Sequence, residues 1–282
     1  MENLSIIIPA KNEELSIGEL IRKLRKKFDQ AQIIVVNDGS TDNTRNEAES
    51  AGATVIDHKY SIGNGAAIKS GARAARGEIF LFMDGDGQHD PEDIPNLLKR
   101  YAEGYDMVVG NRDSKSQASF GRLAANRIYK SLASWVVGHR IRDLTSGFRV
   151  VNAEKFKEFL YLLPNGFSYP TTSTMAFFKA GYSVYYEAIN AHKREGDSHI
   201  RIFRDGVKFL LIIFKVGTLY SPLKLFSLIS SLIFLVGVVF YAYTFFATGR
   251  FTNMGVLLML SSIFIFMIGL VSEQISSLFY KN

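Results

Sequence analysis

The chain has 282 residues, a formal net charge of +6 and no cysteine. This length allows one α/β domain of ordinary size with a smaller part beside it. The lack of cysteine excludes disulfides, thiolate catalysis and thiolate metal sites, so any metal must be held by carboxylate, amide or imidazole groups.

Strands and helices are predicted to alternate along the first 110 residues. Short apolar runs predict strands at 4–8, 33–36, 54–56, 79–83 and 106–109. Amphipathic or glycine-opened segments predict helices at 16–28, from about 43, and at 63–75. Thr41 or Asp42 is expected to cap the second helix. This alternation is typical of a doubly wound, mostly parallel sheet with right-handed crossovers.

The second half of the soluble part is predicted to be richer in helix. We expect residues 120–160 to be helical apart from a polar loop at 143–149, followed by a strand at 182–189. The helices at 120–137 and 200–216 are amphipathic with basic polar faces. Such faces suit a membrane surface, although an ordinary surface helix gives the same pattern.

Two uncharged apolar runs follow, at 225–246 and 254–271. A run of about 20 residues crosses a hydrocarbon core of roughly 30 Å, so we predict two transmembrane helices joined by a tight hairpin. A pair of buried core helices is the alternative. The predicted parts are therefore a catalytic domain at 1–200, an interface helix at 201–222 and a membrane hairpin at 223–282.

Basic residues are concentrated just before the first predicted span. They are Lys193, Arg194, Arg201, Arg204, Lys208, Lys215 and Lys224. By the positive-inside rule, we expect the large N-terminal domain and both termini in the cytoplasm. Anionic lipid head groups would reinforce this placement, so we expect a membrane rather than a nucleic acid as the partner of the positive charge.

Polar clusters follow four of the predicted strands, at 9–13, 38–42, 84–88 and 110–112. In an open α/β sheet, the carboxyl ends of parallel strands meet at one edge, where a nucleotide is the expected ligand. Asp38 is suited to accept hydrogen bonds from a base or ribose. Asp84 and Asp86, after a buried strand, could share one divalent cation that also binds phosphate oxygens. A plain Asp-Gly turn is the alternative.

Seven motifs, in this order, resemble family-2 glycosyltransferases of the GT-A type, specifically the polyprenyl-phosphate hexosyltransferases related to dolichyl-phosphate mannose synthase. The motifs are IIPAKNE at 7–13, VVNDGSTD at 35–42, GNGAAIKSG at 63–71, DGDGQH at 84–89, GNR at 110–112, TSGFR at 145–149 and REGDS at 194–198. The resemblance covers about residues 3–205, and the predicted hairpin matches the membrane-anchored members.

The resemblance implies a role for each motif. Nucleotide-sugar binding would fall to Pro9, Ala10, Glu13, Asp38, Gly63, Lys69, Asp84 and Gln88. Mg²⁺ or Mn²⁺ would be held by Asp84, Asp86 and Gln88. Asp86, Arg112 and Arg149 would be catalytic, and the acceptor phosphate would meet Ser146, Arg149, Arg194 and Ser198. His199 stands where the family commonly has Lys, and its role is left open, as is that of Glu273 in the second predicted span.

The implied reaction transfers a hexose from a nucleotide-diphosphate sugar to a polyprenyl phosphate, with inversion. Because a phosphate monoester has a second pKa of about 6, the acceptor is already a nucleophile at pH 7 and needs no general base. UDP-glucose, UDP-linked amino sugars and GDP-mannose all fit as donors. The prenyl length and a homo-oligomeric state are also left open.

Two other functions remain as alternatives. A processive polysaccharide synthase of the same fold would need more spans and a Gln-x-x-Arg-Trp motif, and the single tryptophan, Trp135, is not preceded by one. A catalytically inactive membrane anchor would not need the Asp84–Asp86 pair. A NAD-dependent oxidoreductase is disfavoured because no GxGxxG follows the first strand.

Overall fold

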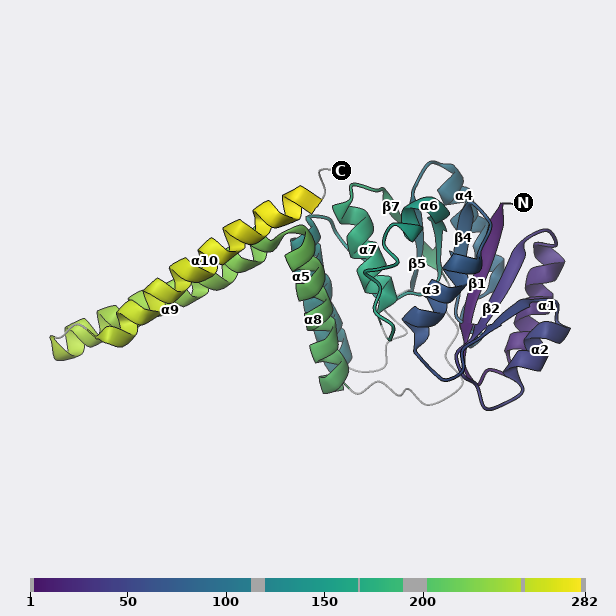
Figure 1. The fold of residues 1–282 in the computed structure, drawn as a ribbon, viewed down its shortest axis with the longest axis horizontal. Helices are drawn as coiled ribbons and strands as arrows, with labels where there is room; N and C mark the ends of the chain where they lie inside the picture. The colour runs from purple at the N-terminus through teal and green to yellow at the C-terminus, as the bar shows by residue number, and fades with distance from the viewer. Residues whose placement is uncertain (1–2, 113–119, 167, 190–201, 250–251, 280–282) are drawn as a thin grey trace. The chain divides into compact units, whose positions relative to one another are not determined.

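A computed structural model describes residues 3–112, 120–166, 168–189, 202–249 and 252–279 (Figure 1). The chain divides into two compact units. The first comprises Met1–Ser131 and His139–Phe209, and the second comprises Leu132–Gly138 and Leu210–Asn282. Helices α5 (Phe120–Val137) and α8 (Ile202–Tyr220) each contribute residues to both units.

The first unit is built on a seven-stranded sheet with the order β3-β2-β1-β4-β6-β5-β7. Its strands are β1 Leu4–Ala10, β2 Gln32–Asn37, β3 Thr54–Asp57, β4 Ile79–Phe82, β5 Met107–Arg112, β6 Arg149–Asn152 and β7 Val184–Ile189. All strand pairs are parallel except those of β6, which runs antiparallel to β4 and β5. The predicted α/β fold with a mostly parallel sheet is therefore confirmed.

Strand β6 corrects the prediction of helix across residues 120–160. Its four residues are too few to show a strand period, and it forms because it pairs with two neighbours at once. Val150 and Val151 are both fully buried in this position. Strand β5 also runs on through Gly110 to Arg112, where we expected a loop, because these residues pair with β7.

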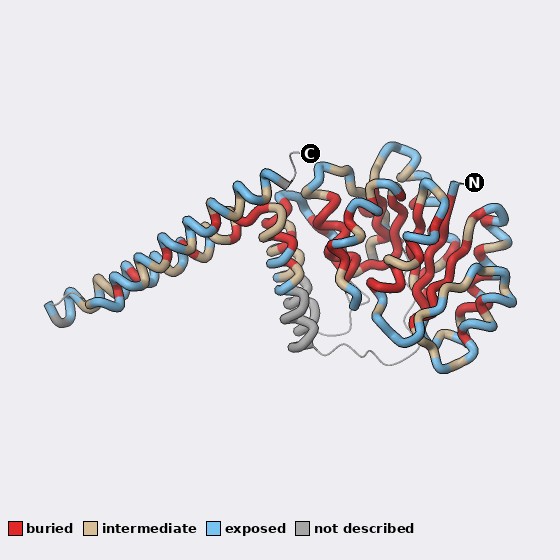
Figure 2. Tube along the Cα trace, viewed as in Figure 1, coloured by how far each residue is buried: buried red, intermediate tan, exposed pale blue. Residues whose placement is uncertain are grey.

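Helices cover the two faces of the sheet. They are α1 Ile17–Lys27, α2 Thr44–Ser50, α3 Asn64–Ala74, α4 Ile94–Ala102, α6 Ala153–Lys157 and α7 Tyr169–Lys179, with a 3₁₀ turn, η1, at Pro91–Asp93. Figure 2 shows the buried residues concentrated along the strands and on the inner faces of these helices. The N-cap of α2 is Asn43, whose side chain makes no capping hydrogen bond. Asp42, one of the two residues that we predicted as the cap, accepts a hydrogen bond from the Thr44 amide at 3.1 Å.

Helix α3 begins in close contact with the backbone of residues 163–166. The amides of Gly65 and Ala66 donate to the carbonyls of Gly166 and Asn165, at 3.1 and 2.8 Å. A Cβ on Gly65 would lie 1.9 Å from the Pro164 carbonyl oxygen. Glycine is therefore required here by the chain's own backbone.

The second unit contains an antiparallel pair of long helices, α9 (Pro222–Thr248) and α10 (Asn253–Phe279), which run side by side in Figure 1. Their apolar segments, Pro222–Ala247 and Asn253–Leu278, have mean hydropathies of 2.4 and 2.6, and both are long enough to cross a membrane. They extend beyond the predicted 225–246 and 254–271. In the most apolar 18-residue stretch of each helix only 17% of the residues are buried, so most of the apolar side chains there face outward rather than into a protein core.

Polar contacts join the helix ends within this unit. Glu273 on α10 accepts a hydrogen bond from the Leu223 amide at 3.1 Å, which satisfies a free donor at the start of α9. A carboxylate also interacts favourably with a helix N-terminus. Lys224 lies 5.0 Å from the centre of the Trp135 ring and donates to the Trp135 carbonyl.

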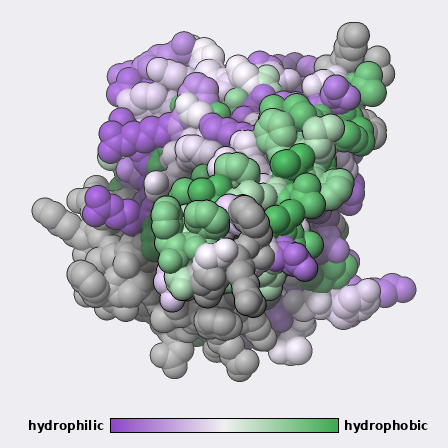
Figure 3. All heavy atoms as spheres, turned by 90° about the vertical axis from the view of Figure 1, so that its left-hand side faces the viewer, coloured by the Kyte–Doolittle hydropathy of each residue, from purple (hydrophilic) through white to green (hydrophobic). Residues whose placement is uncertain are grey.

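Figure 3 shows one face of the molecule, on which hydrophobic side chains, coloured green, gather.

Replacing Gly65 by alanine should destabilise the first unit. The added methyl group would overlap the Pro164 carbonyl, and overpacking of this kind costs about 1–3 kcal/mol. Thermal unfolding followed by circular dichroism would measure the loss. Gly166→Ala is the matched control, since nothing lies within 4 Å of its added Cβ. Equal midpoints for both variants would contradict the proposed close packing.

Candidate active site

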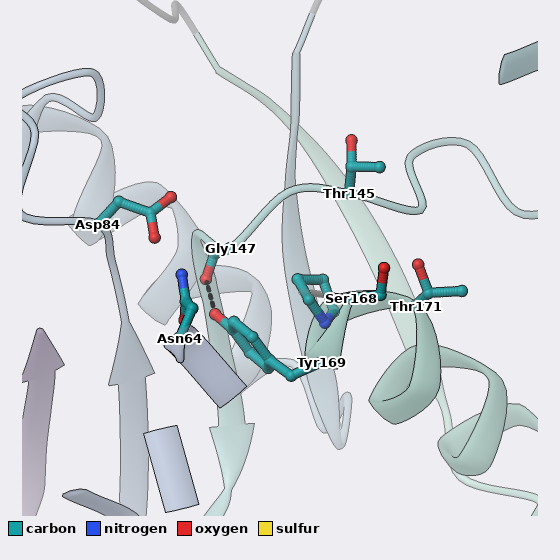
Figure 4. Close-up of a pocket in the computed structure, with 8 residues that line it drawn as sticks. Asn64, Asp84, Thr145, Gly147, Ser168, Tyr169 and Thr171 are labelled. Carbon is teal, nitrogen blue, oxygen red and sulfur yellow. Dashed lines mark hydrogen bonds between the residues drawn. The ribbon is translucent and has the colours of Figure 1, made fainter. Parts of the chain in front are cut away.

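A pocket opens at the carboxyl end of β4 in the first unit (Figure 4). It is lined by Asn64, Asp84, Thr145, Gly147, Ser168, Tyr169, Pro170 and Thr171. These residues come from four places: the start of α3, the turn after β4, the segment that leads into β6, and the first turn of α7 with the residue before it. The pocket therefore brings Asp84, a carboxylate of the DGDGQH motif, opposite the TSGFR motif and the first turn of α7.

The turn after β4 is held against β1 and α1. The Ser16 hydroxyl donates to the Gly85 carbonyl at 2.7 Å, and a Cβ on Gly85 would lie 3.4 Å from the Pro9 carbonyl oxygen. The Asp86 carboxylate accepts a hydrogen bond from the Gln88 amide at 3.1 Å, which shapes the turn. This packing brings the turn with Asp84, Asp86 and Gln88 close to the end of β1.

Gly147 allows the Asp84 carboxylate to approach the TSGFR loop. A Cβ on Gly147 would lie 3.0 and 3.2 Å from the two carboxylate oxygens of Asp84. The Tyr169 hydroxyl donates to the Gly147 carbonyl at 3.0 Å and fixes the loop from the other side. Burial raises the pKa of Tyr169, so this phenol remains a neutral donor.

The described residues contain no group of three or more His, Asp and Glu side chains placed to hold a metal ion. The Asp84–Asp86 pair still fits a hard divalent cation that takes few ligands from the protein. Mg²⁺ commonly binds through one or two carboxylates and completes its shell with water and substrate phosphate oxygens. The carboxylates on the turn meet that requirement, and Gln88 follows them on the same turn.

Asp38 is buried at the end of β2 and is surrounded by donors. Its carboxylate lies 2.7 Å from His58 Nδ1 and accepts hydrogen bonds from the amides of Ile62 and Gly63, at 2.9 and 2.8 Å, and from the Ser61 hydroxyl. Burial acts to raise the pKa of Asp38, but these hydrogen bonds outweigh it and hold the pKa below its usual value.

The Asp38 carboxylate therefore positions the loop at 58–63. Four donors from within the chain already face its two oxygens. These hydrogen bonds account for the burial of the carboxylate without a nucleoside, and its contact with a nucleoside stays a prediction. Gly63 takes part through its amide and has a φ of 119°, a conformation that favours glycine. Lys69 points to another segment, where it donates to the Leu163 carbonyl at 3.1 Å and to the Asn165 side chain.

Arg149 is fully buried, although we expected it to contact a phosphate directly. Its guanidinium donates to the carbonyl of Pro170 at 3.1 Å and to that of Ser146, and to two hydroxyl groups of α7, those of Ser173 at 2.8 Å and Thr174 at 3.1 Å. Burial lowers the pKa of Arg149. The side chain joins the TSGFR loop to the first turns of α7, and its contact with a phosphate stays a prediction.

The other predicted phosphate contacts are placed as follows. Ser146 is buried, and its hydroxyl has no hydrogen-bond partner among the described residues. Arg112 ends β5, but its side chain lies outside the described part of the structure. Arg194, Ser198 and His199 also lie outside the described residues.

Sequence reasoning missed the contribution of α7. Ser168, Tyr169, Pro170 and Thr171 all line the pocket, yet they belong to none of the seven motifs. The one available signal was the Ser-Tyr-Pro sequence, since proline favours the first turn of a helix and serine its cap. That signal predicts a helix start but not its position opposite Asp84.

Comparison with known families agrees with the expected resemblance. Residues 5–160 match the family described as glycosyl transferase family 2. Residues 221–278 match a second family, described as the GtrB C-terminal hairpin.

Two named relatives and one solved structure are similar to this chain over most of its length. The undecaprenyl-phosphate 4-deoxy-4-formamido-L-arabinose transferase of Serratia proteamaculans is 27% identical, over 99% of this chain and 90% of its own. The dolichyl-phosphate hexose transferase of Haloferax volcanii is 28% identical, over 76% of this chain and 94% of its own. The crystal structure of glucosyl-3-phosphoglycerate synthase from Mycobacterium tuberculosis, with Mn²⁺, UDP and phosphoglyceric acid, has a TM-score of 0.63 at 19% identity and covers 76% of this chain and 78% of its own. That likeness shows the shared GT-A fold.

The stabilising effect of Asp38 should depend on pH. Asp38→Asn should lower the free energy of unfolding at pH 7 by about 1–3 kcal/mol. The Ile62 and Gly63 amides donate to different oxygens of Asp38, and the NH₂ that replaces one oxygen cannot accept from the amide that faces it. The pKa of Asp38 in the folded state lies below the unfolded value of about 3.9, so its contribution is complete above that pH and is lost as the pH falls further.

Denaturation of both proteins at pH 7, 5 and 3 would measure this dependence. The difference in stability should be constant from pH 7 to 5 and smaller at pH 3. Asp29→Asn, at an exposed turn, is the control and should show no such difference. If the difference in free energy of unfolding between the wild type and Asp38→Asn grows as the pH falls, the hydrogen bonds assigned to Asp38 are contradicted.

Arg149→Lys should destabilise the first unit by about 1–3 kcal/mol, because a single ammonium group cannot serve all the acceptors that the guanidinium spans. The thermal midpoint should fall, whereas Arg140→Lys at an exposed position should leave it unchanged. A folded Arg149→Lys variant with a normal midpoint but reduced activity would instead indicate a direct contact with substrate.

Proposed function

This chain belongs to glycosyl transferase family 2, and on that premise we propose that it transfers a hexose from a nucleotide-diphosphate sugar to a polyprenyl phosphate. The proposed reaction takes place at the cytoplasmic face of a membrane, requires Mg²⁺ or Mn²⁺, and inverts the anomeric configuration. The chain is a glycosyltransferase with two candidate membrane spans; the donor class, the lipid acceptor and the orientation are the proposal.

One observation carries this proposal. A pocket with the Asp84 carboxylate lies at the carboxyl end of β4, in a chain that also ends in an apolar helical hairpin. The pocket and turn would supply sites for a nucleotide sugar and its metal, and the hairpin would keep the enzyme at the surface where a lipid phosphate is presented. The relatives named for undecaprenyl phosphate and dolichyl phosphate support the same acceptor class.

The nucleotide-sugar donor would bind around the turn after β4. Asp84, Asp86 and Gln88 would hold the divalent cation, which when bound would neutralise charge on the departing nucleotide diphosphate. Pro9, Ala10 and Glu13, at the end of β1, would border the nucleoside. Asp38, Gly63 and Lys69 would act by positioning the neighbouring loops, since their described contacts are within the chain.

The acceptor phosphate supplies its own nucleophilic oxygen. The chain therefore needs to bind and orient the phosphate rather than remove a proton, and correct positioning lowers the barrier by several kcal/mol. Arg112, Arg194 and Ser198 are the proposed phosphate contacts. Arg149 would keep the TSGFR loop, with Ser146, in place beneath them through its contacts to α7.

We propose a three-part organisation to match this chemistry. Residues 1–200 would form the catalytic domain, 201–222 an interface helix, and 223–282 the two-span hairpin, with both termini in the cytoplasm. The basic faces at 120–137 and 200–216 would lie at the anionic lipid surface.

The assay uses the full-length protein in detergent with a polyprenyl phosphate and Mn²⁺ or Mg²⁺. UDP-glucose, UDP-N-acetylglucosamine and GDP-mannose, each labelled in the sugar, are offered in turn, and the lipid phase is extracted. We expect label in the lipid with at least one donor. No label with any donor would contradict the function and favour an inactive anchor, whereas long polymeric products would favour a processive synthase.

Asp84→Asn and Asp86→Asn should each reduce transfer by about 100-fold or more, the scale seen when a fixed electrostatic contact to the transition state is removed. Chelation with EDTA should abolish wild-type transfer, and excess Mn²⁺ should restore it. Asp29→Asn, an exposed carboxylate, should retain normal transfer. Full activity in both carboxylate variants would exclude the proposed metal site.

A further inference from the structure

The first turn of α7 brings several hydroxyl groups to the pocket. Of the hydroxyls in its lining, three donate to the chain itself: Thr145 to the Asp143 carboxylate at 3.1 Å, Tyr169 to the Gly147 carbonyl at 3.0 Å, and Thr171 to the Leu144 carbonyl at 2.9 Å. The fourth, on Ser168, is buried and has no hydrogen-bond partner among the described residues.

Ser168 is also held in an unfavourable backbone conformation. Its φ and ψ are 88° and 20°, in the left-handed region, and its side chain is almost completely buried, with 3% exposed. This conformation and an unpaired buried hydroxyl each destabilise a folded protein, and such features cluster where a ligand is bound. Ser168 is the N-cap of an 11-residue helix, but its hydroxyl makes no capping hydrogen bond to that helix.

The lining indicates what kind of ligand fits. Asp84 is its one ionisable carboxylate, and the eight lining residues include no lysine or arginine. A carboxylate would repel an anionic group that is not bound to a metal, so the part of the pocket near Asp84 is poorly suited to a free phosphate. Hydroxyl, amide and carboxylate groups together match the alternating donors and acceptors of a neutral sugar ring. Figure 4 shows these groups arranged around Gly147, with Asp84 and Asn64 facing the first turn of α7.

We infer that this pocket binds the hexosyl group of the donor, and that Ser168 recognises one sugar hydroxyl and so helps to determine which sugar is transferred. The inference rests on the proposed function and deepens it. One carboxylate oxygen of Asp84 would accept from the sugar on one side of the ring, which leaves the other oxygen for the cation, while the Ser168 hydroxyl would exchange hydrogen bonds with the sugar on the α7 side. The pocket would favour a neutral hexose over one bearing a carboxylate.

Two substitutions separate the hydroxyl from the backbone strain. Ser168→Ala removes the hydroxyl and keeps the side chain that disfavours positive φ, whereas Ser168→Gly removes the hydroxyl and relieves the strain. The matched control is Thr172→Val, which removes a buried hydroxyl of the same helix outside the pocket lining. That hydroxyl donates to the Ser168 carbonyl at 3.3 Å, and the Thr172 amide, which donates to the same carbonyl, is kept. Ser168→Gly should be at least as stable as the wild type, which guards against a loss of folding.

The probe is whichever of UDP-glucose, UDP-N-acetylglucosamine and GDP-mannose the wild-type enzyme uses best. Both Ser168 variants should lower kcat/KM for that donor by about tenfold, the effect of one lost hydrogen bond. Binding of the matching nucleoside diphosphate, without the sugar, should stay within about twofold of the wild type. Thr172→Val should change neither value by more than about twofold.

Deoxy forms of the same donor, each lacking one hydroxyl at position 2, 3, 4 or 6, identify the contact. One of them should lose about tenfold in kcat/KM with the wild type and nothing further with Ser168→Gly, which is the signature of a direct pair. If the wild type uses a donor but every deoxy form loses equally in both enzymes, the inference is wrong while the function stands. If no donor is used, the proposed function fails and the inference fails with it.

Discussion

The buried guanidinium of Arg149 is the interaction on which the candidate site depends. A cation removed from water is stable only when dipoles surround it, and here they come from two separate segments: the Ser146 carbonyl before β6, and the Pro170, Ser173 and Thr174 groups of α7. Satisfying this one side chain therefore forces the TSGFR loop and α7 together. The same contact places the first turn of α7 opposite Asp84.

Glycine makes this convergence sterically feasible. Gly147 lets the Asp84 carboxylate lie against the loop, and Gly65 lets α3 begin against the backbone of residues 163–166. A Cβ on Gly65 would lie 1.9 Å from the Pro164 carbonyl oxygen, which is too close for any other residue, and one on Gly147 would lie 3.0 Å from an Asp84 oxygen, so the carboxylate would have to shift. The glycines of the GNGAAIKSG motif thus serve contacts within the chain, and these contacts form the wall from which Asn64 reaches the pocket.

The chemistry of a lipid phosphate acceptor is consistent with this kind of site. An acceptor that is already ionised requires no general base, and the described lining offers one carboxylate, hydroxyls and an amide rather than a histidine–carboxylate pair. His58 and Asp38 do form such a pair, but they lie in the loop network at the end of β2, with His58 also 2.9 Å from Ser70. Their geometry stabilises that loop and leaves the pocket's chemistry to binding, orientation and charge stabilisation.

The sequence alone determined the features that depend on neighbouring residues. Strand–helix alternation, the Asp84–Asp86 turn after a buried run and the two apolar spans follow from local period, turn chemistry and hydropathy, and the motif order indicated the family. Tertiary structure decided the features that depend on distant partners. Strand β6 formed because β4 and β5 flank it, Asp38 was enclosed by donors 20 to 25 positions away, and Arg149 was buried by a helix more than 20 residues downstream. The strained Ser168 belongs to this second group, because only the folded chain shows that its hydroxyl is buried in the pocket.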